Sequence, residues 1–217
     1  MAWVNGNLEH DWFPRPLPAN IRLGSNAYVE SAYAFEGFFS TRDPGLTMGE
    51  GSGVYGRTSF FTGPNAQIEV GPYTCLNGTA LCCNDRITIG AHCLIAWGSV
   101  ITDIAVPAQD SIHLRRQALL DTASDPDRKL RPMAESAPVI VEDTVWIGFD
   151  SVISAGVRLG RGSVVGCKTI ITKDVPPYTV VVGNPARAIR ILDPDDTPEA
   201  RRAALSEFGL LFPEVKT

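Results

Sequence analysis

The residues that most suggest chemistry form a basic cluster in the C-terminal third of the chain. The segment Ser154–Leu192 contains one acid, Asp174, although the whole chain carries a formal net charge of −5. Its cations are Arg158, Arg161, Lys168, Lys173, Arg187 and Arg190. A local excess of positive charge favours binding of a small polyanion, whereas the acidic chain as a whole argues against nucleic acid as the main partner. The alternative is that these are ordinary solvated charges at the corners of a repetitive fold.

Histidine and cysteine are sparse and poorly spaced for metal binding. The chain has three histidines and five cysteines, and the cysteines form no C-x-x-C pair. A zinc site of the carbonic anhydrase type needs three converging imidazoles, and of His10, His92 and His113 only His92 lies in the repeat described next. We therefore expect no metal site, and we expect the free thiols to pack as small hydrophobic groups.

The element that must position the basic cluster is a repeat with a period of six. An apolar residue recurs every six positions, and a small or β-branched residue keeps step four positions behind it. The first row is Val141, Ile147, Ile153, Leu159, Val165 and Ile171, and the second is Val145, Ser151, Val157, Ser163 and Thr169. Neither an amphipathic helix nor an ordinary strand has this period. It predicts a parallel β-helix, in which each unit buries its apolar face only against its neighbours.

The same period continues upstream with interruptions. The core positions expected there are Ile89, Ile95 and Ile101, preceded by Val70, Leu76 and Cys82, with Thr74, Ala80, Cys93 and Ser99 in the second row. The step of seven from Cys82 to Ile89 requires one residue to bulge near Asn84–Arg86. Earlier runs are Met48, Val54, Phe60 and Ala66, and before them Leu23, Val29 and Phe35.

The segments outside the repeat divide the chain into three parts. We expect an N-terminal arm over 1–20, the β-helix over 21–192 with an inserted loop over 104–138, and a C-terminal helix and tail over 193–217. Within the loop, Ala108–Ser124 is typical of a helix, and Pro198–Phe208 has the cap and stop signals of another. A second excursion is Glu36–Thr47. Met1–Pro18 lacks the pattern of a secretory leader, and no run approaches the ~18 apolar residues needed to cross a membrane, so a reducing cytoplasm is expected.

The last coils resemble those of the hexapeptide-repeat acyltransferases, among them the galactoside, maltose, xenobiotic and sugar acetyltransferases. The resemblance lies in Val145-Trp146-Ile147-Gly148, in Gly156–Gly160 and in Val164-Val165-Gly166, and then in Thr172–Tyr178 and Val182–Arg187. It implies an all-β fold, a left-handed parallel β-helix with an inserted helical loop and a C-terminal α-helix. The left hand comes only from the resemblance, since parallel β crossovers are otherwise right-handed.

The resemblance also implies a homotrimer that uses acetyl-CoA, with the pantetheine arm lying along the coils at a subunit interface. The positions that match the family's contacts with this arm are Trp146, Gly148, Gly166 and Cys167. The nucleotide phosphates would meet Thr172, Lys173, Arg187 and Arg190, and the acceptor would lie near Asn77. The partners implied are thus a small-molecule acceptor and two further copies of the chain, without nucleic acid, membrane or required metal.

One departure concerns the catalytic base. Family members that acetylate hydroxyls carry a histidine at the start of the large loop, where this chain reads Ile101–Pro107 and Val106 takes the matching position. A histidine there removes the proton from the acceptor hydroxyl. The remaining candidates for a proton acceptor are Asp103, Asp110 and His113.

Three functions follow from the missing histidine. The first is an acyltransferase acting on an amine, which attacks unaided once desolvated and positioned, or on a hydroxyl with a base from elsewhere. The second is a β-helix protein that binds CoA or a sugar without catalysis. The third, a metal-dependent hydratase, is rejected because its histidines are lacking.

Overall fold

Three parallel sheets form the body of the protein. The computed structural model describes residues 3–4, 7–8, 10–13, 15–105, 112–125 and 135–194. Sheet 1 contains β3 (Ile21–Leu23), β5 (Leu46–Met48), β8 (Gln67–Val70), β11 (Arg86–Ile89), β16 (Val139–Val141) and β19 (Arg158–Leu159). Sheet 2 contains β4 (Tyr28–Val29), β6 (Gly53–Tyr55), β9 (Cys75–Asn77), β12 (Leu94–Ile95), β17 (Trp146–Ile147), β20 (Val164–Val165), β22 (Thr179–Val182) and β23 (Arg187–Ile191). Sheet 3 contains β7 (Ser59–Thr62), β10 (Ala80–Cys83), β13 (Val100–Thr102), β18 (Val152–Ile153) and β21 (Ile170–Ile171).

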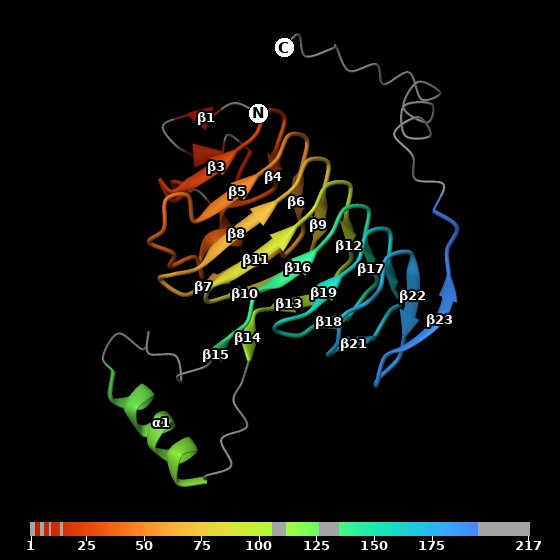
Figure 1. The fold of residues 1–217 in the computed structure, drawn as a ribbon. Coiled ribbons are helices and arrows are strands. Elements are labelled where there is room, and N and C mark those ends of the chain that lie inside the picture. The colour runs from red at the N-terminus through yellow and green to blue at the C-terminus, as the bar shows by residue number, and fades with distance from the viewer. Residues whose placement is uncertain are drawn as a thin grey trace.

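The chain visits the three sheets in turn, so that successive strands form a three-sided coil (Figure 1). Trp146 pairs with Val164 and Val152 pairs with Ile170, so one turn of the coil takes three hexads. Strand β23 departs from this pattern, because it folds back antiparallel on β22 at the end of sheet 2.

The predicted core rows face the interior. All members of the first row are at most 1% exposed, and all members of the second row are at most 2% exposed. The same holds upstream for Leu76, Ile95 and Phe60, which are completely buried. The period-six pattern therefore predicted the core correctly over most of the coil.

The assignment of Cys82 to the core and of Ala80 to the second row was wrong. Leu81, which pairs with Phe60 on one side and Ile101 on the other, occupies the core position. Thr79 and Cys83 are also buried, whereas Ala80 and Cys82 are partly exposed. The turn from Val70 to its partner Ile89 is one residue longer than three hexads. The step from Leu76 to Leu81 is five residues and the step from Leu81 to Ile89 is eight, so the short first step shifts the inward positions of β10 and the extra residues lie after it.

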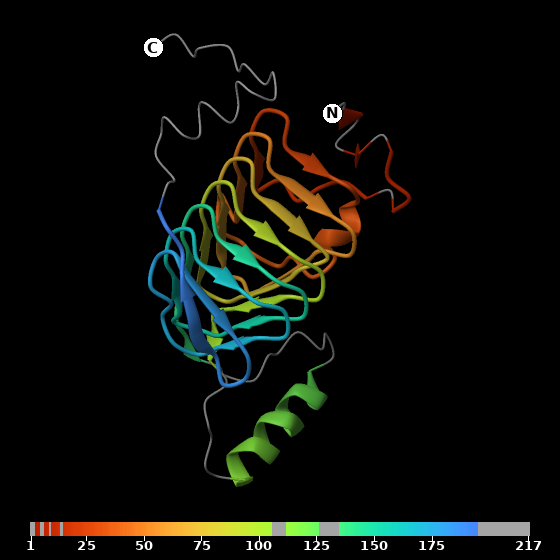
Figure 2. The same cartoon turned by 90° about the vertical axis from the view of Figure 1, so that its right-hand side faces the viewer.

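The large insert leaves and re-enters the coil through a short antiparallel ribbon. Strand β14 (Ile104–Ala105) pairs with β15 (Glu135–Ser136). Helix α1 (Ile112–Ser124) confirms a helix within the predicted Ala108–Ser124. It stands apart from the three sheets (Figure 2), and the apolar side chains Leu119 and Leu120 are largely exposed. The helix predicted at Pro198–Phe208 lies outside the described residues, within which no helix is long and apolar enough to cross a membrane.

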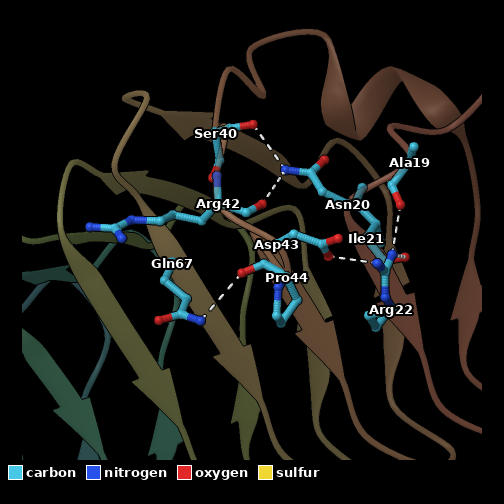
Figure 3. Close-up of polar contacts among 9 residues, drawn as sticks. All are labelled: Ala19, Asn20, Ile21, Arg22, Ser40, Arg42, Asp43, Pro44 and Gln67. Atoms are coloured by element: carbon cyan, nitrogen blue, oxygen red, sulfur yellow. Dashed lines mark hydrogen bonds and ion pairs between the residues drawn. The ribbon is translucent and has the colours of Figure 1, made fainter.

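The excursion Glu36–Thr47 is fastened to the first strands by polar contacts (Figure 3). The Nδ2 atom of Asn20 donates to the backbone oxygens of Ser40 and Arg42, at 2.9 and 2.7 Å. Arg22 forms an ion pair with Asp43, and Gln67 Nε2 donates to the oxygen of Pro44. These contacts join the excursion to β3 and β8 of sheet 1.

The N-terminal arm includes β1 (Trp3–Val4) and β2 (Asn7–Leu8). Asp11 attaches this arm to the 3₁₀ helix η1 (Ala32–Phe35). Its carboxylate accepts from the N–H of Ala32 at 2.6 Å, the N–H of Phe13 at 2.8 Å and the Ser31 hydroxyl at 2.7 Å. Burial raises the pKa of Asp11, but these hydrogen bonds outweigh it and the pKa falls below its ordinary value of 3.8.

A lowered pKa in the folded state makes the contribution of Asp11 to arm docking pH-dependent. It is complete above about pH 3.8 and is lost as the pH falls through the lower folded-state pKa. We expect Asp11→Asn to accelerate hydrogen exchange at the Ala32 amide at pH 7, and to remove most of the acid-dependent loss of protection seen in the wild type. Equal protection of this amide in both proteins would contradict the anchoring role.

Candidate functional site

The structure divides the predicted basic cluster into paired and unpaired cations. Arg158 forms an ion pair with Glu142, and Arg161 Nη2 lies 2.8 Å from Asp143 Oδ2. Both acids lie one turn earlier, at the corner between sheets 1 and 2. Among the described residues, no ion pair neutralises the other members, Lys168, Lys173, Arg187 and Arg190.

The unpaired cations gather around the last turn of the coil. Lys168 lies at the corner between sheets 2 and 3, and Arg187 begins β23 opposite Val182, at the end of β22. Arg190 lies opposite Val180 in the same hairpin, whereas Thr172 and Lys173 follow β21 at the corner between sheets 3 and 1. All of these side chains are exposed. A single chain therefore presents positive charge at two corners of its last turn.

The predicted pantetheine-contact residues lie next to one another on sheet 2 and its following corner. Trp146 projects outward from β17 and is 52% exposed. A Cβ at Gly148 would lie 2.8 Å from the Cys167 backbone nitrogen, so close stacking of the turns requires glycine there. The N–H groups of Gly148 and Gly166 already donate to Val165 and Val181. Neither of these two N–H groups is therefore free to bind a ligand.

Cys167 differs from these glycines. Its side chain is exposed, and its backbone N–H has no hydrogen-bond acceptor within the described part of the chain. The buried thiols are different in character, since burial raises the pKa of Cys93 to about 11 and also raises that of Cys83. Cys167 is thus the most exposed of the five thiols, since Cys75 and Cys82 are partly buried, and its N–H is the open backbone donor at this corner.

Asp103, predicted as a proton acceptor, is completely buried at the base of the insert. Its carboxylate accepts from the N–H groups of Asn84, Asp85 and Arg86 at 2.7–2.8 Å. The Cys83 thiol also lies 3.3 Å from Oδ2. The carboxylate thus holds the turn in which the bulge was predicted, and this placement argues against proton transfer to an acceptor molecule.

The other two predicted acceptor-site residues are not brought together within one chain. Asn77 ends β9 of sheet 2 and is partly buried. His113 belongs to α1 and its side chain is exposed, and this helix stands apart from the coil (Figure 2). The positions Val106 and Asp110 lie outside the described residues. His92 occupies an outward corner with φ 57° and stacks on Tyr73 with a ring separation of 5.3 Å, and His10 packs in the arm against Tyr28.

One feature that the sequence reasoning missed is a stacked pair of exposed aromatic rings. Trp97 and Phe149 have ring centroids 5.6 Å apart and an interplanar angle of 11°. The two residues are separated by the insert in sequence, but each lies just before a corner residue with positive φ, Gly98 or Asp150. Alignment of the corners of successive turns would have predicted the contact.

Comparisons with known proteins agree with this architecture. Residues 138–173 match the family model described as a hexapeptide repeat of succinyl-transferase. A solved hexapeptide-repeat acetyltransferase from Vibrio cholerae, complexed with acetyl-coenzyme A, is 30% identical with a TM-score of 0.53, over 69% of this chain and 72% of that chain. The chain belongs to the hexapeptide-repeat acetyltransferase family. The family resemblance of the last coils is thereby confirmed.

Other members of this family are similar over part of the chain. The galactoside O-acetyltransferase of Escherichia coli is 35% identical over 101 residues, which is 45% of this chain and 50% of that protein. A mutant N-acyltransferase from Bacillus cereus, solved with dTDP and coenzyme A, is 16% identical with a TM-score of 0.63, over 86% of this chain and 91% of that chain, and shows a shared fold. The chain spans about half the length of the curated relatives it matches.

Proposed function

We propose that this protein transfers an acetyl group from acetyl-CoA to a small-molecule acceptor. The observation that carries this proposal is the likeness to a family member solved with acetyl-coenzyme A. The unpaired cations at the end of the coil support it, because positive charge attracts the polyanionic nucleotide of this ligand. We further propose that the coil is left-handed, as in the acyltransferases that the last turns resemble.

Acetyl-CoA would lie along the corner between sheets 2 and 3. Its phosphates would meet Lys173, Arg187 and Arg190 beside Thr172, since charge-assisted hydrogen bonds to phosphate are strong. The pantetheine arm would pass Trp146 and the free N–H of Cys167. The thioester supplies an activated acyl group, and the protein supplies its position relative to the acceptor.

A homotrimer would complete this site. Lys173 and Arg187 lie at different corners of one chain. Lys173 of one copy and Arg187 of a neighbouring copy could therefore contact the nucleotide of the same acetyl-CoA molecule. The outer face of sheet 2 supports self-association, because it carries an apolar ladder. Its members are Tyr28, Gly53, Cys75, Leu94, Trp146, Val164 and Val180. The corresponding ladder on sheet 1 is Arg22, Thr47, Glu69, Thr88, Ile140 and Arg158.

The trimer interface can be tested with a matched pair of variants. Leu94→Glu places a charge on the apolar ladder and is expected to give a monomeric mass by light scattering at micromolar concentration, because a buried unpaired charge is costly. Ile140→Glu makes the same exchange on sheet 1 beside Arg158 and should leave the trimer intact. A monomeric wild type would contradict the composite site.

We favour an amine as the acceptor group. Asp103 holds a turn and Val106 replaces the usual histidine, so within the described residues no carboxylate is placed at the predicted position to deprotonate a hydroxyl, and a free amine needs no such base. A base supplied by His113 from a neighbouring copy would reverse this preference. The same observation favours, as a second candidate, a protein that binds CoA without catalysis. The free cysteines support a reducing compartment such as the cytoplasm.

Protection of Cys167 by acetyl-CoA tests the cofactor position. We expect one fast-reacting thiol with a disulfide reagent at pH 8, absent in Cys167→Ser, and we expect saturating acetyl-CoA to slow it at least tenfold. The buried Cys93, with its raised pKa of about 11, should react slowly in either case because the thiolate is the reactive form. Calorimetric binding of acetyl-CoA without protection of Cys167 would move the pantetheine arm to another corner.

A further inference from the structure

The corner between sheets 2 and 3 repeats one backbone conformation through successive turns. A residue with positive φ occurs in each turn at Gly56, Gly78, Gly98, Asp150 and Lys168. The residues directly before them are Tyr55, Asn77, Trp97, Phe149 and Cys167. Trp97, Phe149 and Cys167 each follow a core residue (Ile95, Ile147 and Val165) by two positions, so they form one column along the coil. Tyr55 and Asn77 follow Val54 and Leu76 by one position, so they are level with Ala96 and lie beside this column.

Two members of this column, Trp97 and Phe149, form an aromatic platform. Trp97 is 54% exposed and Phe149 is 45% exposed, and their rings are nearly parallel. One side of the indole lies against Gly78, where a Cβ would collide with Trp97 Cδ1. Phe149 packs on the indole from the next turn. The platform is therefore held in place by glycine beneath it and offers ring surface to solvent.

Polar groups lie at both ends of the platform. The carboxylate of Asp150 lies over Gly98, where a Cβ would collide with Oδ1. This side chain is exposed and forms no ion pair with any residue in the described ranges. At the other end, two polar atoms approach Gly56. A Cβ placed on this glycine would lie 3.3 Å from Asn77 Oδ1 and 3.5 Å from Trp97 Nε1.

The position of the platform connects it to the reaction. Cys167, beside which the pantetheine arm is proposed to pass, is the next member of the column after Phe149. Asn77, the expected acceptor contact, lies beside Trp97 on the preceding turn, where its Oδ1 and the indole Nε1 both approach Gly56. A thioester extending along this corner from Cys167 would reach the platform before it reaches Asn77. Apolar surface with a few directed polar groups is typical of small-ligand sites.

We propose that Trp97, Phe149 and Asp150 bind the acyl acceptor, and that the acceptor is a cyclic polyol carrying a primary amine. This assignment rests on the proposed acetyl transfer. The C–H face of the ring would lie on the platform, and ring hydroxyls would face Asn77. The protonated amine would pair with Asp150 and contact the aromatic rings, an arrangement favoured by charge-assisted hydrogen bonding and by cation–π attraction.

The acetyl transfer then balances without further reactants. The bound ammonium first loses a proton to solvent, and the free nitrogen attacks the thioester carbonyl carbon. The new C–N bond forms as the C–S bond breaks, the nitrogen releases its second proton, and the CoA thiolate takes up a proton. The products are an amide and free CoA thiol. Asp150 thus selects the cationic acceptor and is not required as a base.

The test compares binding of glucosamine and of neutral glucose to the full-length protein saturated with CoA, by calorimetry. Asp150→Asn should weaken glucosamine binding about tenfold, the expected loss of one charge-assisted contact, and leave glucose binding unchanged. Phe149→Leu should weaken both sugars severalfold. Asp85→Asn, which removes an exposed carboxylate at the turn between β10 and β11, is the matched control and should change neither.

The outcomes separate this assignment from the proposed function. Two results would overturn the acceptor assignment alone while acetyl-CoA still binds. In the first, neither Asp150→Asn nor Phe149→Leu changes the affinity for glucosamine. In the second, the wild type does not bind glucosamine at concentrations well above a Kd of about 1 mM. Loss of the trimer in Phe149→Leu without a change in glucosamine affinity would show that a second copy covers the rings, and also overturns it. Failure of the wild type to bind acetyl-CoA contradicts the proposed function itself.

Discussion

Replacing Asp103 by asparagine should lower the free energy of unfolding by about 1–3 kcal/mol for each buried backbone N–H that loses its acceptor. The carboxylate is fully buried and accepts from three consecutive backbone N–H groups at Asn84, Asp85 and Arg86. An asparagine amide offers one oxygen and turns its own NH₂ group toward the remaining donors. Urea unfolding monitored by circular dichroism measures the effect.

This prediction separates a structural role of Asp103 from a catalytic one. If Asp103 were the general base, Asp103→Asn would retain most of its stability and lose turnover by about 10²–10⁴-fold. Asp85→Asn is the stability control, because its exposed carboxylate lies in the same turn and forms no hydrogen bond or ion pair with the described residues. A stable Asp103→Asn protein that binds acetyl-CoA but has lost its activity would contradict the structural account.

Removing Lys173 and Arg187 together should weaken binding of CoA on the order of 100-fold, because each charge-assisted contact to phosphate contributes roughly 1.5–3 kcal/mol. These cations have no carboxylate partner among the described residues, so their full charge is available to the nucleotide. Dephospho-CoA, which lacks the 3′-phosphate, should lose much less affinity in the double variant. Calorimetry at two salt concentrations measures both ligands and the expected screening.

The paired arginines supply the control for this experiment. Arg158 and Arg161 carry the same charge on the same turns, but Glu142 and Asp143 neutralise them. Arg158→Ala with Arg161→Ala should therefore change CoA affinity less than threefold, since exposed ion pairs contribute about 0–1 kcal/mol. Equal losses for the two double variants would indicate a diffuse electrostatic effect rather than a defined phosphate site.

The fold was largely predictable because the core of the coil is a local, repeating pattern. Each apolar residue contacts its counterpart one turn away, so the period of six determined which side chains face inward from Val141 to Ile171. The prediction failed at Cys82, because the step from the core residue Leu76 to the next one is five residues rather than six, which moved the inward positions to Leu81 and Cys83. A slip of one residue reverses the faces of a strand, and no nearby sequence signal marked where the slip occurs.

The candidate site was less predictable because its contacts cross between turns. The sequence showed six cations together, but the partners of Arg158 and Arg161 lie at Glu142 and Asp143, one turn upstream. Asp103 looked like a free acid beside the loop, and only the structure brings the three backbone donors of the preceding turn to it. Trp97 and Phe149 lie on opposite sides of the inserted loop in sequence and stack only after the coil closes.

The measurement that tests acetyl transfer most directly is the release of free CoA thiol from acetyl-CoA in the presence of paired acceptors. Aminosugars and the corresponding hydroxylated sugars should be compared with wild-type protein and with His113→Ala. We expect acceptor-dependent thiol release with amines, rising with the fraction of free amine and unchanged in His113→Ala. Rapid turnover of hydroxyl acceptors that collapses in His113→Ala would place the base on the helix of the insert and contradict the amine preference. Binding of acetyl-CoA without thiol release for any acceptor would contradict catalysis itself.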